Sequence, residues 1–298
     1  MIEREICGVL PVNKPAGMTS HDVVFKIRKL YGTKKVGHTG TLDPDATGLL
    51  IVLIGRAAKA AEYVVAGKKV YRAGLRLGLT TDTEDTTGKT LTTSDNIPEK
   101  AAVLEAVGSF LGESLQVPPM YSALKVGGKT LCDLARQGIT VEREARPITI
   151  YSISADGDGR DYCLDVACSA GTYIRTLCAD IGARLGCGGA MSSLFRTETG
   201  GFHISSAHTL TEIEALTQEE RDALLIPTES LFTSLPVVVL PAFFERLAGN
   251  GAEIYQKKIG TAFPTGTLLR VHGGSGFFGI GEVREYESGS AIKMVKFL

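Results

Sequence analysis

An uninterrupted apolar run, LLIVLIG from Leu49 to Gly55, follows directly on a polar loop rich in Gly and Thr. A short apolar run closed by a turn residue is typical of a β-strand buried on both faces. Such a strand needs other elements on each side of its sheet. A chain of 298 residues, 44% of them hydrophobic, has enough apolar material to provide them and is long enough for two domains.

The loop before this strand, VGHTGTLDPDATG, contains more polar groups than a turn requires. Pro44 restricts the preceding residue to extended geometry and so holds the Asp43 side chain in one direction. A carboxylate beside a buried strand costs free energy unless a cation or hydrogen-bond donors hold it. Arg175 is a candidate partner, because it lies in the first turn of a predicted helix, off the apolar stripe. The commoner alternatives are an Asp that only begins a turn and a surface arginine.

Helices and strands are mixed along the chain without a regular alternation, which favours an α+β fold over a doubly wound one. The first predicted helix has Ser20 as its N-cap. Apolar periodicity and turn residues predict helices over 20–32, 99–112 and 172–186, and strands over 8–17, 49–55, 68–78 and 162–171.

Two segments differ from the rest of the chain. Residues 116–147 begin and end near prolines and carry five basic residues against three acids, which indicates an excursion from the main body. From about Leu235 onward, Gly becomes frequent and short strand-like pieces dominate, which indicates a small β-rich second domain.

Charge is distributed unevenly although the net charge is −1. Residues 21–72 carry ten Lys or Arg against four acids, whereas 73–113 carry three against seven. This asymmetry permits a basic face for RNA on a near-neutral protein. The alternative is a solvated surface on which the charges cancel in space.

Several common chemistries have no support in the sequence. The GSGFFG segment matches a dinucleotide fingerprint, but a strand pattern follows it, so we expect a hairpin turn there. TTGKT lacks the first Gly of a phosphate-binding loop, and no G-x-S-x-G motif occurs. The histidines lack metal-ligand spacing. The six scattered cysteines suggest reduced thiols in a cytosolic protein. We expect no membrane span and no signal peptide.

Five stretches, in order along the chain, resemble the TruB family of pseudouridine synthases. The resemblance runs from about Val9 to Arg196, and the G-H-T-G-x-L-D-P-x-A-T-G block is highly specific. The tail FPTGTLLRVHGGSGFFGIGEV resembles the PUA domain of bacterial members. The five stretches are GHTGTLDPDATGLL, KKVYRAGLRLGLTTDTEDTTG, PPMYSALKVGGKTLCDLARQG, REARPI and SAGTYIRTLCADIGARLGCG.

The resemblance implies a mixed, mainly antiparallel sheet in a catalytic domain over 1–235, with 116–147 as an RNA-binding thumb. A PUA-like domain would follow over 236–298. The implied activity is isomerisation of uridine 55 in the T loop of tRNA to pseudouridine, with base flipping and without cofactor or metal. The implied partner is tRNA, contacted at the T stem-loop and, through the C-terminal domain, at the acceptor stem. We expect a cytoplasmic monomer with no membrane association and no obligate protein partner.

The resemblance also assigns roles to residues. Asp43 would be the catalytic carboxylate, Arg175 its partner, and Tyr71 the stacking residue that also relays a proton. Tyr173 and Leu194 would join Tyr71 in binding the flipped base, and His38, also a substrate-binding residue, would lie against the flipped region. Expected RNA contacts are Lys14, Lys125, Lys129, Arg136 and Arg146. A tRNA-folding chaperone without chemistry is the alternative function, and a guide-RNA-directed relative is a second one.

Overall fold

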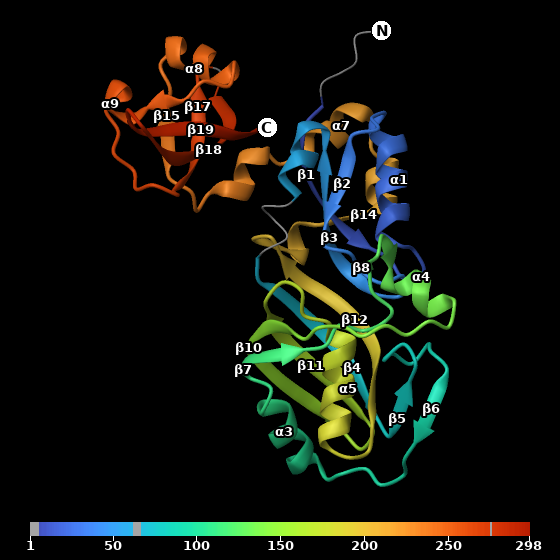
Figure 1. The fold of residues 1–298 in the computed structure, drawn as a ribbon. Helices are drawn as coiled ribbons and strands as arrows, with labels where there is room; N and C mark the ends of the chain where they lie inside the picture. The colour runs from blue at the N-terminus through green and yellow to red at the C-terminus, as the bar shows by residue number, and fades with distance from the viewer. Residues whose placement is uncertain (1–5, 62–66, 275) are drawn as a thin grey trace.

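The computed structural model describes residues 6–61, 67–274 and 276–298. Residues 1–5, which belong to the segment expected not to be a signal peptide, lie outside this description, as does Ser275 in the predicted hairpin turn. Figure 1 shows a large sheet that forms the length of the molecule and a small sheet that lies to one side, at the end where β1 and α1 lie.

The large sheet has ten strands, in the order β14-β1-β3-β12-β4-β11-β10-β7, with β2 and β13 added beside β3 and β12. Only the β1–β14 and β3–β12 pairs are parallel, so the predicted mixed, mainly antiparallel α+β architecture is confirmed. Its strands are β1 Gly8–Lys14, β2 Val36–Thr39, β3 Thr47–Ile54, β4 Lys69–Leu77, β7 Gly112–Gln116, β10 Arg146–Asp158, β11 Asp161–Cys168, β12 Gly189–Thr199, β13 Phe202–His203 and β14 His208–Thr209.

The predicted central strand is β3, and it is buried on both faces. Residues 49–54 are all 0% exposed. Leu50, Val52 and Ile54 pack against the apolar side of α1 (Ser20–Tyr31). The alternate residues pack on the other face against the 3₁₀-helix η1 (Gly55–Ala60) and partly buried side chains between 202 and 231. Strand β3 therefore anchors the polar loop that precedes it.

Helix α1 corrects one sequence expectation. Its N-cap is Thr19, whose hydroxyl accepts from the Asp22 N–H while the Asp22 carboxylate accepts from the Thr19 N–H. Ser20 is the first helical residue and is buried, because its side chain bonds to the backbone of another loop. Two capping residues stand side by side in this sequence, and tertiary contact decides which of them caps.

A second core lies at the other half of the large sheet, where α3 (Lys100–Gly108) and α5 (Ile174–Arg184) cover β4, β11 and β12. The apolar stripe predicted for α5 is buried, with Leu185 partly so. Further elements are β5 Leu79–Thr81, β6 Thr90–Thr93, β8 Lys125–Val126, β9 Lys129–Thr130, α4 Leu131–Arg136, η2 Ile204–Ser206, α6 Leu210–Ala215, α7 Gln218–Ala223 and η3 Thr228–Phe232.

The C-terminal sheet has five strands in the order β15-β17-β18-β19-β16 and its own apolar core. A smaller cluster joins it to the rest, because Ile280 and Leu298 are buried together with Ala60 and Phe232. Its elements are β15 Val237–Val239, α8 Ala242–Gly249, β16 Ile254–Tyr255, α9 Gln256–Ile259, β17 Leu268–Gly273, β18 Gly276–Tyr286 and β19 Gly289–Phe297. The domain boundary at 235/236 and the likeness to a PUA domain stay predictions.

No helix in the described ranges combines the length and apolar character needed to cross a membrane. The six cysteines are free thiols.

Candidate active site

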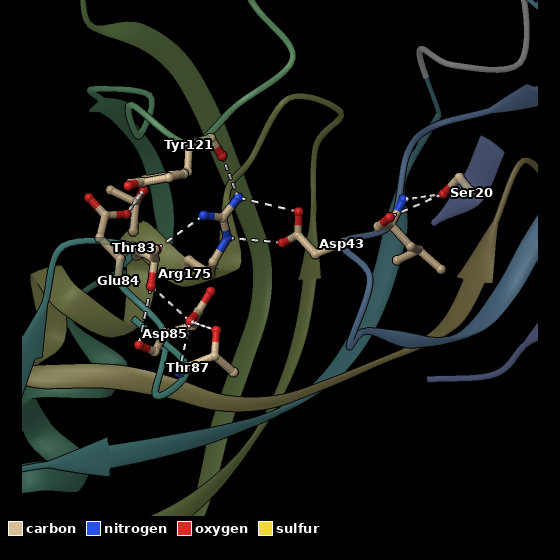
Figure 2. Close-up of polar contacts among 10 residues, drawn as sticks. Ser20, Asp43, Thr83, Glu84, Asp85, Thr87, Tyr121 and Arg175 are labelled. Atoms are coloured by element: carbon tan, nitrogen blue, oxygen red, sulfur yellow. Dashed lines mark hydrogen bonds and ion pairs between the residues drawn. The ribbon is translucent and has the colours of Figure 1, made fainter. Parts of the chain in front are cut away.

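The loop that carries Asp43 is held in place by the N-terminal segment of the chain. The Ser20 hydroxyl accepts from the Leu42 N–H at 2.9 Å and lies 3.1 Å from the Leu42 carbonyl oxygen, to which it donates (Figure 2). On the other side of Asp43, the Pro44 carbonyl accepts from the Gly17 N–H at 3.0 Å and from Lys14 Nζ at 2.8 Å. Both neighbours of Asp43 are thus fixed by contacts far away in sequence, and its carboxylate has a defined direction.

Asp43 and Arg175 form a side-on ion pair. Arg175 Nε lies 2.9 Å from Asp43 Oδ2, and Nη2 lies 3.4 Å from Oδ1 (Figure 2). The guanidinium is 6% exposed, whereas the Asp43 side chain is 40% exposed. The arginine is therefore a buried support, and the carboxylate keeps a free approach. A two-contact pair of this kind fixes orientation as well as charge. The structure thus brings together two residues that the sequence proposed as partners.

Arg175 is itself held from two other directions. Its Nη1 donates to the Thr83 carbonyl at 3.1 Å, and its Nη2 donates to the Tyr121 carbonyl at 2.7 Å (Figure 2). Tyr121 belongs to the 116–147 segment. A conformational change in that segment would therefore reach the guanidinium directly.

The Thr83 carbonyl belongs to a tightly folded loop, residues 82–88. Asp85 Oδ1 accepts from the Thr83 hydroxyl, the Thr87 hydroxyl and the Thr87 N–H within 2.6–3.0 Å. Glu84 has φ 62°, a left-handed conformation unusual for its type, and its carboxylate accepts from Thr176 on α5 at 2.6 Å. The density of Asp and Thr in residues 82–88 is the sequence signal that side chains, not glycines, build this turn.

A cavity of about 590 Å³ opens beside the Asp43 carboxylate. Tyr71, Tyr173 and Leu194, to which the resemblance assigns base binding, line it. Arg136 of α4 lines both this cavity and a second one of about 370 Å³ that also borders Asp43. Two aromatic rings and a leucine beside an ion-paired carboxylate make a slot that suits a flat, partly polar ring.

Tyr71 lies on β4 opposite Arg196 of β12 and is 6% exposed. Burial raises the pKa of the Tyr71 phenol above its ordinary value, while the nearby Arg196 guanidinium opposes this shift. Tyr71 is accordingly a neutral phenol in the free protein at neutral pH.

Tyr173 is positioned by Gln116, a residue that the sequence analysis did not single out. The buried Gln116 amide accepts from the Tyr173 N–H at 2.8 Å and donates to the Tyr173 carbonyl at 3.1 Å. Gln116 is the last residue of β7, so the edge of the large sheet sets the start of α5 and the Tyr173 position. No sequence pattern signals this contact between residues 57 positions apart.

One sequence expectation, that for Lys14, differs from the structure. Lys14, expected to contact RNA, is 0% exposed and donates to the carbonyls of Pro15, Met18 and Pro44. Its three donors are used, so it supports the Asp43 loop and offers nothing to a phosphate. His38 lies on β2 outside the cavity lining, half-buried, and burial lowers its pKa. The expectation that His38 lies against the flipped region stays a prediction.

The remaining expected RNA contacts are accessible. Lys125, Lys129, Arg136 and Arg146 are all exposed. The first two lie on the β8–β9 hairpin, Arg136 ends α4, and Arg146 begins β10. Within the described residues, no three His, Cys, Asp or Glu side chains gather closely enough to hold a metal ion.

Family models match most of the chain. The TruB family pseudouridylate synthase N-terminal domain matches residues 28–174, and the tRNA pseudouridylate synthase B C-terminal domain matches residues 175–233. The chain is 43% identical over 295 residues to tRNA pseudouridine synthase B of Alkaliphilus oremlandii, covering 98% of each protein. It is 44% identical to the protein of the same name from Clostridium kluyveri, covering 97% of this chain and 98% of the relative.

Among solved structures, the chain resembles one from a crystal structure of a Cbf5–Nop10–Gar1 complex. The TM-score is 0.73 at 27% identity, over 97% of this chain and 84% of the other. The likeness extends over both sheets, since nearly the whole chain is covered.

Proposed function

This chain belongs to the TruB family of pseudouridylate synthases, and from this premise we propose that it converts uridine 55 in the T loop of tRNA to pseudouridine. The observation that carries the proposal is the Asp43–Arg175 pair, whose carboxylate faces a cavity lined by Tyr71, Tyr173 and Leu194. Relatives at 43–44% identity over nearly the full length are named tRNA pseudouridine synthase B.

The reaction is an isomerisation. The C1′–N1 bond of uridine breaks and its electron pair leaves with the base; the base turns, C5 bonds to C1′, C5 loses a proton and N1 gains one. Atoms and electrons balance without an oxidant, a nucleotide or a metal. Asp43 supplies the carboxylate, either as nucleophile at C1′ or C6 or as base at C2′. Arg175 holds that carboxylate in position through two contacts.

A uridine folded within a loop must be flipped out before it reaches Asp43, and flipped bases stack between aromatic and apolar side chains. Tyr71 and Leu194 supply such surfaces in the cavity, with Tyr173 beside them. Tyr71 also takes part in removal of the C5 proton, because Asp43 is committed to the glycosidic step. His38, outside the cavity, would contact the space vacated by the flipped nucleotide.

RNA recognition rests on shape and backbone charge. The exposed Lys125 and Lys129 on the hairpin, together with Arg136 and Arg146, would contact the T loop. The C-terminal sheet would lie near the acceptor stem. We place the protein in the cytoplasm as a monomer that needs no protein partner.

Two alternatives are weaker. A tRNA-folding chaperone without chemistry has no use for a half-exposed carboxylate held by a buried arginine, since that carboxylate would face RNA phosphates. A guide-RNA-directed relative is also less well supported, because the identity to the chain from the Cbf5–Nop10–Gar1 complex is 27%, well below that to the tRNA pseudouridine synthase B relatives.

The test is incubation of the purified protein with an unmodified tRNA transcript, followed by mapping of pseudouridine along the RNA. The expected result is a single new pseudouridine at position 55. A matched transcript with cytidine at that position should give none. Pseudouridine only at other positions, or none at all, would overturn the proposal.

A further inference from the structure

Lys69 is a cavity residue to which neither the sequence analysis nor the proposed function assigns a role. It is the first residue of β4, is 9% exposed and lines the cavity together with Asp43, Tyr71 and Leu194. Residues two apart in a strand point to the same face of a sheet. The Lys69 ammonium and the Tyr71 ring therefore lie on the same side of β4.

No acid balances this ammonium. Across the described part of the chain, the Lys69 side chain has no ion pair or hydrogen bond, although its backbone belongs to the sheet. The charged group that acts on it is a second cation, the fully buried Arg196, and together with burial it lowers the Lys69 pKa. Its strand partner Cys168 does not compensate, because burial raises the pKa of that thiol to about 11. A desolvated cation without a partner is costly, so the site is built for an anion that is absent in the resting protein.

Gly40 shapes the space in which the two cations meet. A Cβ at this position would lie 3.3 Å from Lys69 Nζ and 3.5 Å from Arg196 Nη1. Arg196 donates its Nε to the Leu49 carbonyl at 2.8 Å and its Nη2 to the Gly40 carbonyl at 3.0 Å. Among the described residues, the buried Arg196 Nη1 has no hydrogen-bond partner, and neither has the buried Thr39 hydroxyl next to Gly40. Arg196 is thus fixed in place and keeps the local potential positive.

We propose that Lys69 is a further catalytic residue, whose ammonium donates to the uracil as that base leaves C1′. When the C1′–N1 bond breaks, its electron pair stays on the base, and the negative charge spreads over N1, O2 and O4. Lys69 remains protonated and donates a hydrogen bond to one of the two carbonyl oxygens. A fixed donor placed where charge develops stabilises the transition state more than the ground state. This inference rests on the proposed function.

A backbone phosphate is the competing anion, but the burial of Lys69 argues against it. Phosphates of a bound RNA stay near solvent, where the exposed Lys125 and Lys129 lie. An ammonium that is 9% exposed and stands beside the Tyr71 ring meets the inserted base instead.

The test compares Lys69→Met with Lys68→Met. Lys68 is the preceding residue in the chain, but it lines a different cavity and pairs with Glu198 at 3.8 Å. At saturating enzyme, Lys69→Met should slow single-turnover pseudouridine formation by about a hundredfold with an unchanged Kd for tRNA. Lys68→Met should keep the wild-type rate. Because the Lys69 side chain makes no hydrogen bond within the described residues, the variant should fold. Thermal melting checks this, and Lys69→Gln is used instead if Lys69→Met does not fold.

A second variant and a modified substrate separate hydrogen-bond donation by Lys69 from a role as a base. Lys69→Arg keeps the cation but cannot act as a base, so it should stay within about tenfold of the wild-type rate. With 5-fluorouridine at the target position, whose base is a better leaving group, the deficit of Lys69→Met should shrink, measured as consumption of 5-fluorouridine.

An unchanged rate in Lys69→Met would overturn the proposal, as would a weaker Kd with a normal saturated rate, which would assign Lys69 to a phosphate. If Lys69→Arg loses the rate as Lys69→Met does, Lys69 would act in a proton transfer, and this result would also overturn the proposal. If the wild-type protein makes no pseudouridine, the proposed function fails, and that result is distinct from all of these.

Discussion

Tyr71 is the residue whose role is most sharply divided between two physical effects. If the ring only stacks, Tyr71→Phe should keep most of the rate, and Tyr71→Leu should lose about ten- to a hundredfold, since base–aromatic stacking contributes about 1–3 kcal/mol. We expect instead that both variants are severely impaired in single-turnover assays, because the hydroxyl takes part in proton transfer. A Phe variant within about threefold of wild type, about 0.65 kcal/mol of barrier, would reduce Tyr71 to a stacking surface.

Lys14 should contribute to stability and not to RNA affinity. Its buried ammonium donates to three carbonyls, and burial lowers its pKa. Lys14→Met leaves these acceptors without a partner, so we expect a loss of about 3 kcal/mol in the free energy of unfolding. Chemical denaturation measures this loss, and filter binding of the folded variant should give a wild-type Kd. Weaker tRNA binding by a variant of normal stability would show instead that Lys14 contacts RNA.

At the residue scale, the sequence predicted the parts of the site that carry a local signature. Asp43 before Pro44, and Arg175 off an apolar stripe, could be paired because a charge beside a buried strand needs a partner. Lys69, Arg196 and Gln116 could not be found this way. Sheet register places Lys69 in the cavity wall and Arg196 opposite Tyr71, and loop closure brings Gln116 to the backbone of Tyr173. Local spacing in the sequence reveals neither.

At the scale of elements, the predicted strands and helices are present with small shifts at their ends, because apolar periodicity decides where a segment can be buried. The prediction that Ser20 is the N-cap was wrong because Thr19, one residue earlier, competes for the same role. The 82–88 loop shows a different limit of prediction from sequence. Its fold depends on Asp85 accepting three hydrogen bonds, and its function depends on one carbonyl that reaches Arg175.

The β8–β9 hairpin should contribute charge to tRNA binding and nothing to chemistry. Replacing both Lys125 and Lys129 with alanine removes two exposed cations. We expect the slope of log K against log salt to flatten by about 1.4–1.8, with an unchanged rate at saturating enzyme. Lys100→Ala, which removes an exposed lysine from α3, should leave the slope unaltered. An unaltered slope in the double variant would show that the hairpin does not contact the RNA.

At the scale of the whole molecule, the proposed chemistry lies entirely on the large sheet and its loops, before residue 200. The C-terminal sheet adds a separate core, and it meets the rest through a small apolar cluster and through Glu229, which contacts Arg270 and His272. Composition alone indicated this second β-rich unit, because Gly-rich turns between short strands are a local pattern. The cluster that joins the two sheets was not predictable, since it depends on how the units dock.

A chain that ends at residue 235 should bind tRNA more weakly yet form pseudouridine at high enzyme concentration. Truncation exposes Ala60 and Phe232, so thermal melting must first show that the remaining protein is folded. Product mapping over a range of enzyme concentrations then gives the result. A folded truncation that is inactive at every concentration would show that the C-terminal sheet takes part in the chemistry.

The central claim is that the Asp43 carboxylate performs the chemistry and does not supply affinity. Asp43→Asn keeps the shape of the side chain and removes its charge, so binding and single-turnover product formation should be measured on the same tRNA transcript. We predict no detectable pseudouridine, with a Kd within about tenfold of wild type, about 1.4 kcal/mol. Pseudouridine formation by Asp43→Asn at a rate near that of wild type would contradict the account.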